Sequence, residues 1–344
     1  MDRFRVGVLG ATGLVGQRLI SLLADHPWFV VETLAASPRS EGRTYAEAVT
    51  WELRDPPSPT IAAMPLRSAT TRSFEHCELV FSVLPSSTAA TIEPDLVADG
   101  VVLVSNASTL RMDPSTPLLM PEVNPEQLAL VEARARAGEG FAVTNPNCCV
   151  TGLVLGLVAV WRKWGIEDVQ VTTLQAISGA GRAAAAAMPI EDNILPSIAG
   201  EEAKLESEPA KILGGPLTVS AQCNRVPVVD GHLMTVAVRT TRECHPAEVV
   251  EGMRQFRVSD RVATLPSALE HPICVRDEDD RPQPRLDRDH AGGMGVVVGR
   301  VRSCPIMGLK WTILCHNTLR GAAGGALLNA ELLVRQELIA RRSS

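Results

Sequence analysis

The chain has 344 residues, a length that predicts about two domains, each large enough to bury its own core. Hydrophobic residues make up 45% of it and charged residues 21%, proportions that are typical of globular proteins and exclude global disorder. The formal net charge of −6 argues against a nucleic-acid partner, and no apolar run is long enough to span a membrane.

The eight cysteines follow no regular spacing, and no signal peptide precedes the first predicted strand. This pattern predicts a cytoplasmic protein with reduced thiols, which binds neither nucleic acid nor membranes. No CxxC pair and no histidine-rich cluster indicates a metal site, so we expect none.

A glycine-rich turn follows the first predicted strand, at residues 5–9. Glycines stand at positions 7, 10, 13 and 16, and a helix is predicted at 17–23. Glycine at such a turn lets the backbone approach a pyrophosphate, whose charge meets the N-terminus of the helix. The turn therefore predicts a dinucleotide site, and the alternative is a tight turn without a ligand.

The end of the second predicted strand, at 29–36, indicates which dinucleotide is bound. A site that prefers NAD usually places an acid there for the ribose 2′-hydroxyl, whereas an arginine accommodates the 2′-phosphate of NADP. Here Ser37, Arg39 and Ser40 supply hydroxyls and a cation, while Glu32 lies too early in the strand. The pattern predicts NADP; the alternative is a solvated turn in which Arg39 binds nothing.

Strands and helices alternate up to residue 145, interrupted by a predicted proline-rich loop at 54–65. Further strands are predicted at 78–84, 101–104 and 140–143. This alternation predicts an α/β protein with an N-terminal Rossmann-type, doubly wound parallel sheet. Ligands of such folds bind at the carboxyl ends of the strands, which is where Ser86, Asn106 and Cys148 fall.

The segment Asn-Pro-Asn-Cys-Cys at 145–149 lies between a predicted strand and a long apolar helix. Pro146 cannot continue the strand and Asn147 is a favourable N-cap, so the helix is predicted to begin at Cys148. A thiol in the first turn of a helix faces unpaired N–H groups and the positive end of the helix dipole, which favour the thiolate. Cys148 is therefore a candidate nucleophile, and the alternative is a buried structural cysteine.

The second half of the chain has a different pattern. Strands are predicted at 169–177, 219–224, 233–239 and 296–302, and helices near 246–257 and at 318–341. The charged stretch 277–295, rich in proline and glycine, is predicted to be a loop. Together these elements predict a second, α+β domain with a mixed sheet.

Several segments, in the same order as in one known family, carry a specific resemblance. They are Gly-Ala-Thr-Gly-Leu-Val-Gly at 10–16, Asn-Ala-Ser-Thr-Leu-Arg-Met at 106–112, Pro-Glu-Val-Asn-Pro at 121–125, Asn-Pro-Asn-Cys at 145–148, Gln-Ala-Ile-Ser-Gly-Ala-Gly-Arg at 175–182, Gly-Glu-Glu-Ala-Lys at 200–204, Asn-Arg-Val-Pro-Val-Val-Asp-Gly-His at 224–232 and Asn-Thr-Leu-Arg-Gly-Ala-Ala-Gly at 317–324. Over nearly its whole length the chain resembles aspartate-β-semialdehyde dehydrogenase, most closely the archaeal and fungal branch.

The resemblance implies the NADP-dependent, reversible oxidation of L-aspartate 4-semialdehyde with phosphate to L-4-aspartyl phosphate through a cysteine thioester. This reaction belongs to the biosynthesis of lysine, threonine and methionine. The implied catalytic residues are Cys148, His232, Gln175 and Asn147, and the implied substrate-binding residues are Arg111, Glu201, Lys204 and Arg225. The implied cofactor-binding residues are Gly10, Ala11, Thr12, Gly13, Leu14, Val15, Ser37, Arg39, Ser40, Ser86, Ser178, Gly179 and Asn317.

The chemistry of these residues suits that reaction. A reaction through a thioester needs a nucleophile, a hydride acceptor or donor, and an acid–base group such as His232 at the same carbon. An imidazolium beside the cysteine would also favour the thiolate. The Asn147 side chain and the Cys148 N–H could form an oxyanion hole. Guanidinium groups suit phosphate and carboxylate, a carboxylate at Glu201 suits an ammonium group, and Lys204 would share its helical face. Taken singly, each charged residue could instead be a solvated surface group, and His232 a turn histidine.

Four functions remain open at this point. The first is the dehydrogenase activity above, and the second is a malonyl-CoA reductase, whose archaeal form resembles this family. The third is an N-acetylglutamyl-phosphate reductase, disfavoured because that family has glycine where Asn147 stands. The fourth is a paralogue without activity. Cys149 stands where the family usually has serine or threonine, a departure that bears on the substrate specificity.

The resemblance also implies a domain organisation. Residues 1–147 and the C-terminal helix at 318–342 would form the NADP-binding domain, and residues 148–317 would form the catalytic and dimerisation domain. The expected partners are the small-molecule substrate, phosphate and a second copy of the chain, in a homodimer or homotetramer.

Overall fold

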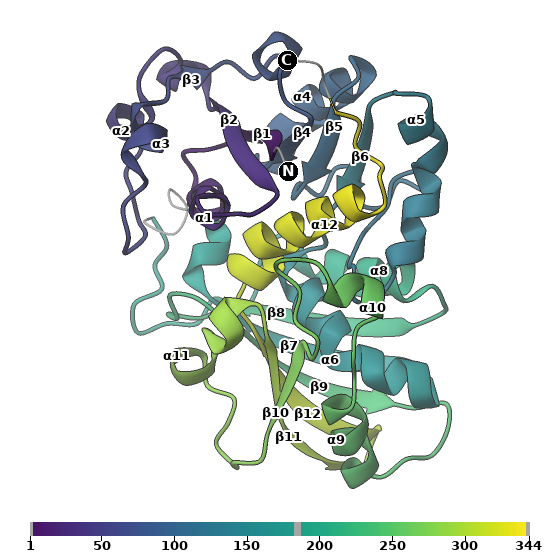
Figure 1. Cartoon of the computed structure of the whole chain (residues 1–344). Helices are drawn as coiled ribbons and strands as arrows, with labels where there is room; N and C mark the ends of the chain where they lie inside the picture. Colours follow the sequence, from purple (N-terminus) through teal and green to yellow (C-terminus); the bar gives the residue numbers. More distant parts are fainter. Residues whose placement is uncertain (1–2, 182–186, 342–344) are drawn as a thin grey trace.

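The computed structural model describes residues 3–181 and 187–341. Arg182, which ends one resembling segment, and residue 342, the predicted end of the first domain, lie outside these ranges. The described strands form two six-stranded sheets, one drawn in purple and blue in the upper half of Figure 1 and the other in teal to yellow-green in its lower half. None of the described helices is long and apolar enough to cross a membrane.

The first sheet is parallel throughout, with the strand order β3-β2-β1-β4-β5-β6. Its strands are β1 (Phe4–Leu9), β2 (Phe29–Ala35), β3 (Leu66–Arg67), β4 (Leu79–Ser82), β5 (Val102–Ser105) and β6 (Phe141–Thr144). β4 and β6 are buried over their whole length, as expected when both faces of a parallel sheet are covered. The predicted Rossmann-type sheet is confirmed.

The helices of this half are α1 (Leu14–Leu23), α2 (Tyr45–Ala48), α3 (Pro59–Ala63), α4 (Ser86–Ala98) and α5 (Glu132–Arg136), with single turns at Pro38–Ser40, Thr71–Phe74 and Pro125–Leu130. α1 begins at Leu14, earlier than predicted, because Gly13 is its extended N-cap residue. The prediction of a plain loop at 54–65 is wrong. There the Ser58 hydroxyl caps α3 and Pro59 fits its first turn.

The second sheet is mixed, as predicted, with the strand order β10-β11-β12-β9-β7-β8. Its strands are β7 (Asp168–Gln175), β8 (Thr218–Arg225), β9 (His232–Arg239), β10 (Ile273–Arg276), β11 (Val296–Cys304) and β12 (Gly308–Cys315). Two of these, β10 and β12, were not predicted. The helices of this half are α6 (Cys148–Trp164), α8 (Glu201–Leu213), α9 (Pro246–Arg254), α10 (Asp260–Ala263) and α11 (Pro284–Asp287), with single turns at Ile177–Ala180 and His290–Gly293.

The stretch 277–295 was predicted as a loop, yet it contains α11 and one of the single turns. The fully buried Asp287 carboxylate accepts a hydrogen bond from the Gln283 N–H and is paired with Arg276 and Arg281. These contacts stabilise an ordered structure in a segment whose proline and glycine content had predicted a loop.

Helix α6 lies against the second sheet at close range. A Cβ atom on Gly152 would stand 2.5 Å from Cβ of Cys315, and one on Gly156 would stand 2.4 Å from Cδ1 of Ile313. Only glycine permits this separation between the helix and β12.

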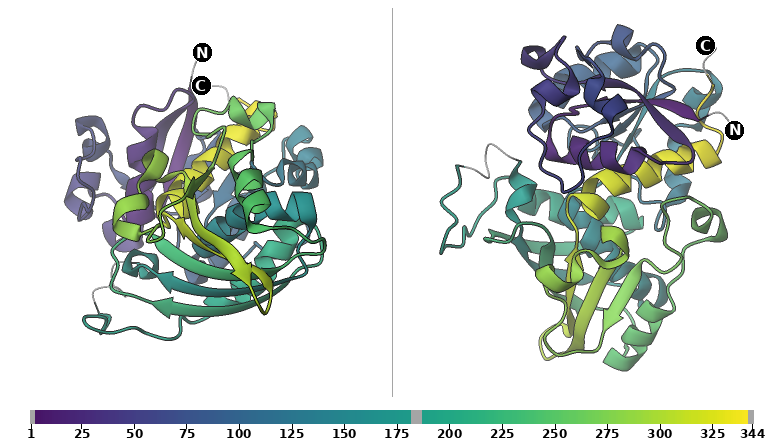
Figure 2. Two further views of the ribbon diagram at one scale, coloured as in Figure 1. Left: turned by 90° about the horizontal axis from the view of Figure 1, so that it is seen from below. Right: turned by 60° about the vertical axis from the view of Figure 1, so that its left-hand side comes forward.

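The last helical segment crosses between the two sheets. It consists of a π-helical turn, η6 (Leu319–Ala323), and α12 (Gly324–Arg335), drawn in yellow in Figure 1 and in the right-hand view of Figure 2. The helix ends at Arg335 and not at residue 341 as predicted. The chain then runs to Arg341, whose guanidinium group lies 3.4 Å from the centre of the Phe4 ring on β1.

Candidate active site

The site is built around the first turn of α6, which begins at Cys148 as predicted. The Oδ1 atom of Asn147 accepts hydrogen bonds from the N–H groups of Cys149 (2.9 Å) and Val150 (3.3 Å), so this side chain is the N-cap. The preceding strand, β6, ends at Thr144, two residues before Pro146. Cys148 therefore stands at the positive end of a long helix, with a partly exposed side chain.

His232 meets Cys148 from the first position of β9. Its Nε2 atom lies 3.2 Å from Sγ of Cys148, and its Nδ1 atom accepts a hydrogen bond from the Ala176 N–H at 3.0 Å. Because Nδ1 acts as an acceptor, the proton of the ring is on Nε2 and faces the sulfur. The ring thus offers its Nε2–H as a hydrogen-bond donor to the sulfur.

The two adjacent cysteines differ in protonation. The Cys149 thiol donates a hydrogen bond to the Cys148 sulfur, and this bond, together with the nearby His232 ring, lowers the pKa of Cys148 well below its ordinary value despite burial. Burial and the same bond raise the pKa of Cys149, which is fully buried. Cys148 is accordingly the thiolate and Cys149 its hydrogen-bond donor.

Cys148, Cys149 and His232 also form the only group of three or more such residues, within the described part of the chain, whose Cys, His or carboxylate ligand atoms all lie within 4.8 Å of one another. A metal bound at Nε2 would require the ring proton on Nδ1, where the Ala176 N–H already points. The tautomer therefore favours nucleophilic chemistry over metal binding.

Glu201, the first residue of α8, gathers three of the predicted residues. Its carboxylate accepts hydrogen bonds from Asn147 Nδ2 (2.9 Å), Lys204 Nζ (2.7 Å) and, weakly, Gln175 Nε2 (3.5 Å). Burial opposes its charge, but Lys204 and Asn147 keep the pKa of Glu201 below its ordinary value. The cluster therefore presents a charged carboxylate close to Cys148, and one N–H of the Asn147 amide is already used.

Arg225 ends β8 beside the same centre, where its Nη1 donates to the Ala176 carbonyl at 2.8 Å. A Cβ atom on Gly179 would lie 3.0 Å from that Nη1 and 3.2 Å from the ring of His232. Gly179 thus packs against both residues, and its lack of a side chain keeps the space around them open.

Arg111 is held in place by an acid that the sequence analysis missed. Its Nη1 pairs with Glu208 Oε1 at 3.0 Å, and its Nη2 donates to the Asn106 carbonyl at 2.6 Å. Glu208 stands seven residues after Glu201 on α8. The spacing of Glu201, Lys204 and Glu208 places all three on one helical face, which is the signal that could have revealed it.

Lys211, one turn further along α8, was also missed. Its Nζ donates to the carbonyls of Arg111, Asp113 and Thr116, at 2.7, 2.7 and 2.8 Å. It fixes the loop that carries Arg111.

The turn after β1 fits a dinucleotide phosphate. Gly10 has φ +91°, and a Cβ atom there would lie 2.9 Å from the Val83 carbonyl oxygen. Gly13 caps α1 without a side chain, and the first turn of this helix carries no acid, so its N–H groups remain available to an anion. Ala11 and Thr12 lie in this turn, and Leu14 and Val15 begin the helix.

The other predicted cofactor residues lie in three places. Ser37, Arg39 and Ser40 follow β2, where Ser37 and Arg39 are exposed and Ser40 is partly so. Ser178 and Asn317 meet in a hydrogen bond of 2.8 Å, while the Ser86 hydroxyl accepts from the Ser108 N–H at 3.1 Å. Ser37, Arg39 and Ser40 are not in contact with Cys148 and His232. An extended dinucleotide could bridge the separation between these two sets of residues.

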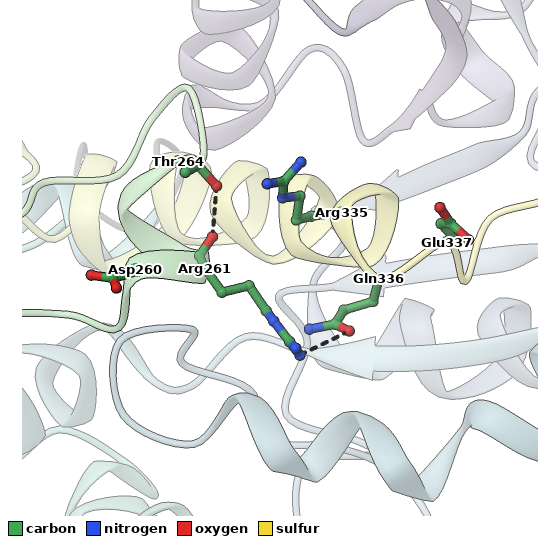
Figure 3. Close-up of a pocket in the computed structure, with 6 residues that line it drawn as sticks. All are labelled: Asp260, Arg261, Thr264, Arg335, Gln336 and Glu337. Atoms are coloured by element: carbon green, nitrogen blue, oxygen red, sulfur yellow. Dashed lines mark hydrogen bonds between the residues drawn. The ribbon is translucent and has the colours of Figure 1, made fainter.

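A surface pocket lies away from this chemistry, between α10 and the end of α12 (Figure 3). Its lining includes Arg261, Thr264 and Arg335, and the Arg261 guanidinium donates to Gln336 at 3.2 Å. None of the predicted site residues lines it, and it supplies no cysteine or histidine to attack a carbonyl group.

Comparison with known proteins agrees with this geometry. Residues 5–131 match a model described as the NAD binding domain of semialdehyde dehydrogenase, and residues 157–320 match its dimerisation domain. Among curated proteins, the aspartate-semialdehyde dehydrogenase of Archaeoglobus fulgidus is 44% identical, over 98% of this chain and 100% of its own length. That of Cryptococcus neoformans is 42% identical, over 98% of both chains.

A solved structure extends the similarity to three dimensions. The aspartate semialdehyde dehydrogenase of Candida albicans, determined with NADP, superposes with a TM-score of 0.91 at 39% identity, covering 98% of this chain and 100% of the other. With a Rossmann-type sheet, a helix that starts at a cysteine paired with a histidine, and relatives this similar over their full length, the chain belongs to the aspartate-semialdehyde dehydrogenase family.

Proposed function

We propose that the chain catalyses the NADP-dependent, reversible oxidation of L-aspartate 4-semialdehyde with phosphate to L-4-aspartyl phosphate. The observation that carries this proposal is the contact of 3.2 Å between the Cys148 sulfur and Nε2 of His232. The names of the relatives agree with it, as does the Candida albicans enzyme determined with NADP.

In the oxidative direction the Cys148 thiolate attacks the aldehyde carbon, and the Nε2–H of His232 donates a hydrogen bond to the oxyanion of the resulting thiohemiacetal. The carbonyl group re-forms as hydride leaves the carbon, which leaves a thioester on Cys148. Bound NADP supplies the hydride acceptor. Phosphate attacks the thioester, the sulfur leaves as thiolate, and the acyl phosphate is released.

The remaining residues are proposed to bind the reactants. Arg225 would pair with the substrate carboxylate, and Arg111 and Lys204 with phosphate. Glu201 would bind the substrate ammonium group. Lys204 is paired with Glu201 in the ligand-free chain, so the substrate ammonium group would compete with Lys204 for Glu201. The Lys204 ammonium group, once displaced, would be available to bind phosphate.

The cofactor is proposed to lie across the first sheet from the glycine-rich turn. Gly10 to Val15 would receive the pyrophosphate, and Ser37, Arg39 and Ser40 the 2′-phosphate. Ser86, Ser178, Gly179 and Asn317 would contact the nicotinamide half.

Glu201 would favour this substrate over malonyl-CoA. Both carry a terminal carboxylate for Arg225, but only aspartate semialdehyde has an ammonium group. A buried carboxylate stabilises an ammonium group, and malonyl-CoA has no ammonium group with which to gain this interaction. We therefore expect no reduction of malonyl-CoA.

Steady-state assays of nicotinamide reduction test this assignment. The parent protein is expected to oxidise aspartate semialdehyde only with phosphate and NADP. Glu201→Gln is expected to lower kcat/KM by about ten-fold or more, the effect of losing one charge-assisted hydrogen bond. Glu206→Gln, at an exposed position on the same helix, is the control and should change little. Robust reduction of malonyl-CoA by the parent protein would refute the assignment, and inactivity with every substrate would favour a paralogue without activity.

We also propose the organisation expected from the sequence. Residues 1–147 with the C-terminal segment would bind NADP, and residues 148–317 would catalyse the reaction and dimerise, giving a homodimer or homotetramer in the cytoplasm. The match of residues 157–320 to a dimerisation domain supports the dimer. Light scattering would measure the assembly.

A further inference from the structure

Glu208 lies at the junction of two parts of the candidate site that are far apart in the sequence. It is 2% exposed and stands on the buried face of α8 with Glu201. One of its oxygens, Oε2, accepts a hydrogen bond from the N–H of Asn147 at 2.8 Å, and the other, Oε1, is paired with Arg111 Nη1 at 3.0 Å. A single carboxylate therefore links the residue before the nucleophile to the arginine proposed to bind phosphate.

Arg111 is fixed on several sides, and one of its three guanidinium nitrogens has no partner. Nη1 is held by Glu208 and Nη2 by the Asn106 carbonyl, while Lys211 holds the Arg111 carbonyl. The Nε atom is buried and has no hydrogen-bond partner. A buried guanidinium N–H is costly to leave unpaired, so its orientation is best explained by an anion that it receives during function.

We propose that Glu208 is a positioning residue that sets the distance between the phosphate-binding Arg111 and the turn that carries Cys148. This proposal rests on the proposed function, because it assigns a role within the same site. Glu208 touches neither the thioester nor phosphate. It acts by holding the anion-binding guanidinium group where phosphate can attack the thioester carbon, a reaction that depends strongly on the alignment of the two reactants.

Glutamine at this position separates charge from shape. A carboxylate accepts a hydrogen bond at each oxygen, whereas an amide accepts at one end and donates at the other. In Glu208→Gln either the Asn147 N–H or the Arg111 guanidinium must therefore face an NH₂ group. The size of the side chain is preserved, but one of the two links is lost in either orientation.

The kinetic test uses Glu208→Gln in the full chain, with Glu206→Gln on the exposed face of the same helix as the matched control. The expected result is a KM for phosphate raised by about ten-fold or more, with a much smaller change in the KM for aspartate semialdehyde, as expected for losing one charge-assisted bond. Equal changes in both constants, or no change in either, would overturn the proposal, since a role in stability alone would not separate the two reactants.

A double-mutant cycle tests whether Glu208 acts through Arg111. Arg111→Lys and the double variant Arg111→Lys/Glu208→Gln are measured with the same assay. If Glu208 works by placing Arg111, the two substitutions are non-additive, and Glu208→Gln raises the KM for phosphate much less once Arg111 is replaced. Additive effects would contradict the proposal.

A binding measurement separates this inference from the proposed function and does not require turnover. Inorganic phosphate should raise the thermal unfolding midpoint of the parent protein and raise that of Glu208→Gln markedly less. A parent protein that is stabilised by phosphate but inactive on aspartate semialdehyde would refute the proposed substrate while leaving the role of Glu208 standing. Equal stabilisation of the parent and Glu208→Gln would overturn that role. Should Glu208→Gln not fold, Glu208→Asp, which keeps both acceptors on a shorter stem, is measured in its place with the same expected direction.

Discussion

At the scale of single residues, the adjacent cysteines at the start of α6 have opposite roles. Cys148 faces the His232 ring, whereas the fully buried Cys149 thiol serves as its hydrogen-bond donor. The pKa of Cys148 is lowered first by this bond, and the pKa of Cys149 is raised by burial. An ordinary pair of cysteines would both be protonated at neutral pH; here one thiolate is stabilised by its neighbour.

This arrangement predicts how the activity depends on pH. Since the pKa of Cys148 is lowered, the thiolate and the rate are present well below the ordinary cysteine value, and the rate falls as the pH drops through the lowered pKa. Cys148→Ala should abolish turnover. Cys149→Ser should keep most of it, because serine also donates. Cys149→Ala should move the acid limb of the kcat/KM profile to higher pH, the effect of losing a hydrogen bond to a charged group.

The profiles of the three variants are measured beside the parent. If Cys148→Ala kept its activity while Cys149→Ser lost it, the assignment of the nucleophile would be reversed. An acid limb unchanged in Cys149→Ala would mean that its thiol does not stabilise the thiolate.

At the scale of elements, the π-helical turn η6 presses against the nucleophile. The N–H groups of Gly321 and Ala323 donate to the carbonyls of His316 and Thr318, five residues earlier, at 3.0 and 3.1 Å. A Cβ atom on Gly321 would lie 2.8 Å from Cβ and 2.9 Å from Cα of Cys148. The turn brings the last helical segment of the chain so close to the first turn of α6 that only glycine fits, and π-helical turns of this kind are frequent at functional sites.

Gly321→Ala is therefore expected to displace Cys148. Its neighbours are backbone and Cβ atoms that cannot rotate away, so the start of α6 or the π turn must move. We expect kcat to fall by about 100-fold, the effect of a misplacement of about 1 Å, with overpacking that costs about 1–3 kcal/mol of stability. Kinetics and thermal unfolding are measured together.

Gly138→Ala is the control for the stability loss. Gly138 has φ +71° and open space around its Cα, remote from the site, so alanine strains the backbone there without touching Cys148. It should lower the unfolding midpoint and leave kcat near the parent value. Similar losses of kcat in both variants would show that instability, and not the contact with Cys148, limits the rate.

At the scale of the whole molecule, a buried histidine links stability to pH near the contact between the two halves. His316 is 1% exposed, and burial lowers its pKa from 6.5 to about 4. Asp230 and Arg18, which are paired at 3.4 Å, lie close enough to influence it. The folded protein thus holds a neutral ring that the unfolded chain would protonate more readily.

The sign of the effect follows from this difference. The contribution of the neutral His316 ring to the free energy of unfolding is fully present above about pH 6.5, and it is lost as the pH falls toward about 4. The loss is up to about 3 kcal/mol, since one pKa unit corresponds to about 1.4 kcal/mol. Thermal unfolding across this range should give a shallower dependence on pH in His316→Gln than in the parent. His76→Gln, at a side chain that is 65% exposed, should keep the parent slope, and an unchanged slope in His316→Gln would contradict the prediction.

Much of the architecture follows from local sequence signals. The order of strands and helices in the first half, the glycine-rich turn and the start of α6 at Cys148 each depend on residues close together in the chain, such as Pro146 and Asn147. Apolar periodicity, capping preferences and backbone limits act over a few residues and are therefore legible in one sequence. The resemblance of short segments supplied the roles of Cys148 and His232, which remain predictions until the variants are measured.

The tertiary structure alone decided the contacts made across long stretches of chain. The tautomer of His232 depends on the Ala176 N–H, and the placement of Arg111 depends on Glu208. The π turn depends on its packing against α6. β10 and β12 were missed because pairing with a distant strand, and not their own sequence, makes them strands. Such contacts form only when folding buries polar groups, which must then find hydrogen-bond partners far away in the sequence. A pattern of neighbouring residues therefore does not predict them.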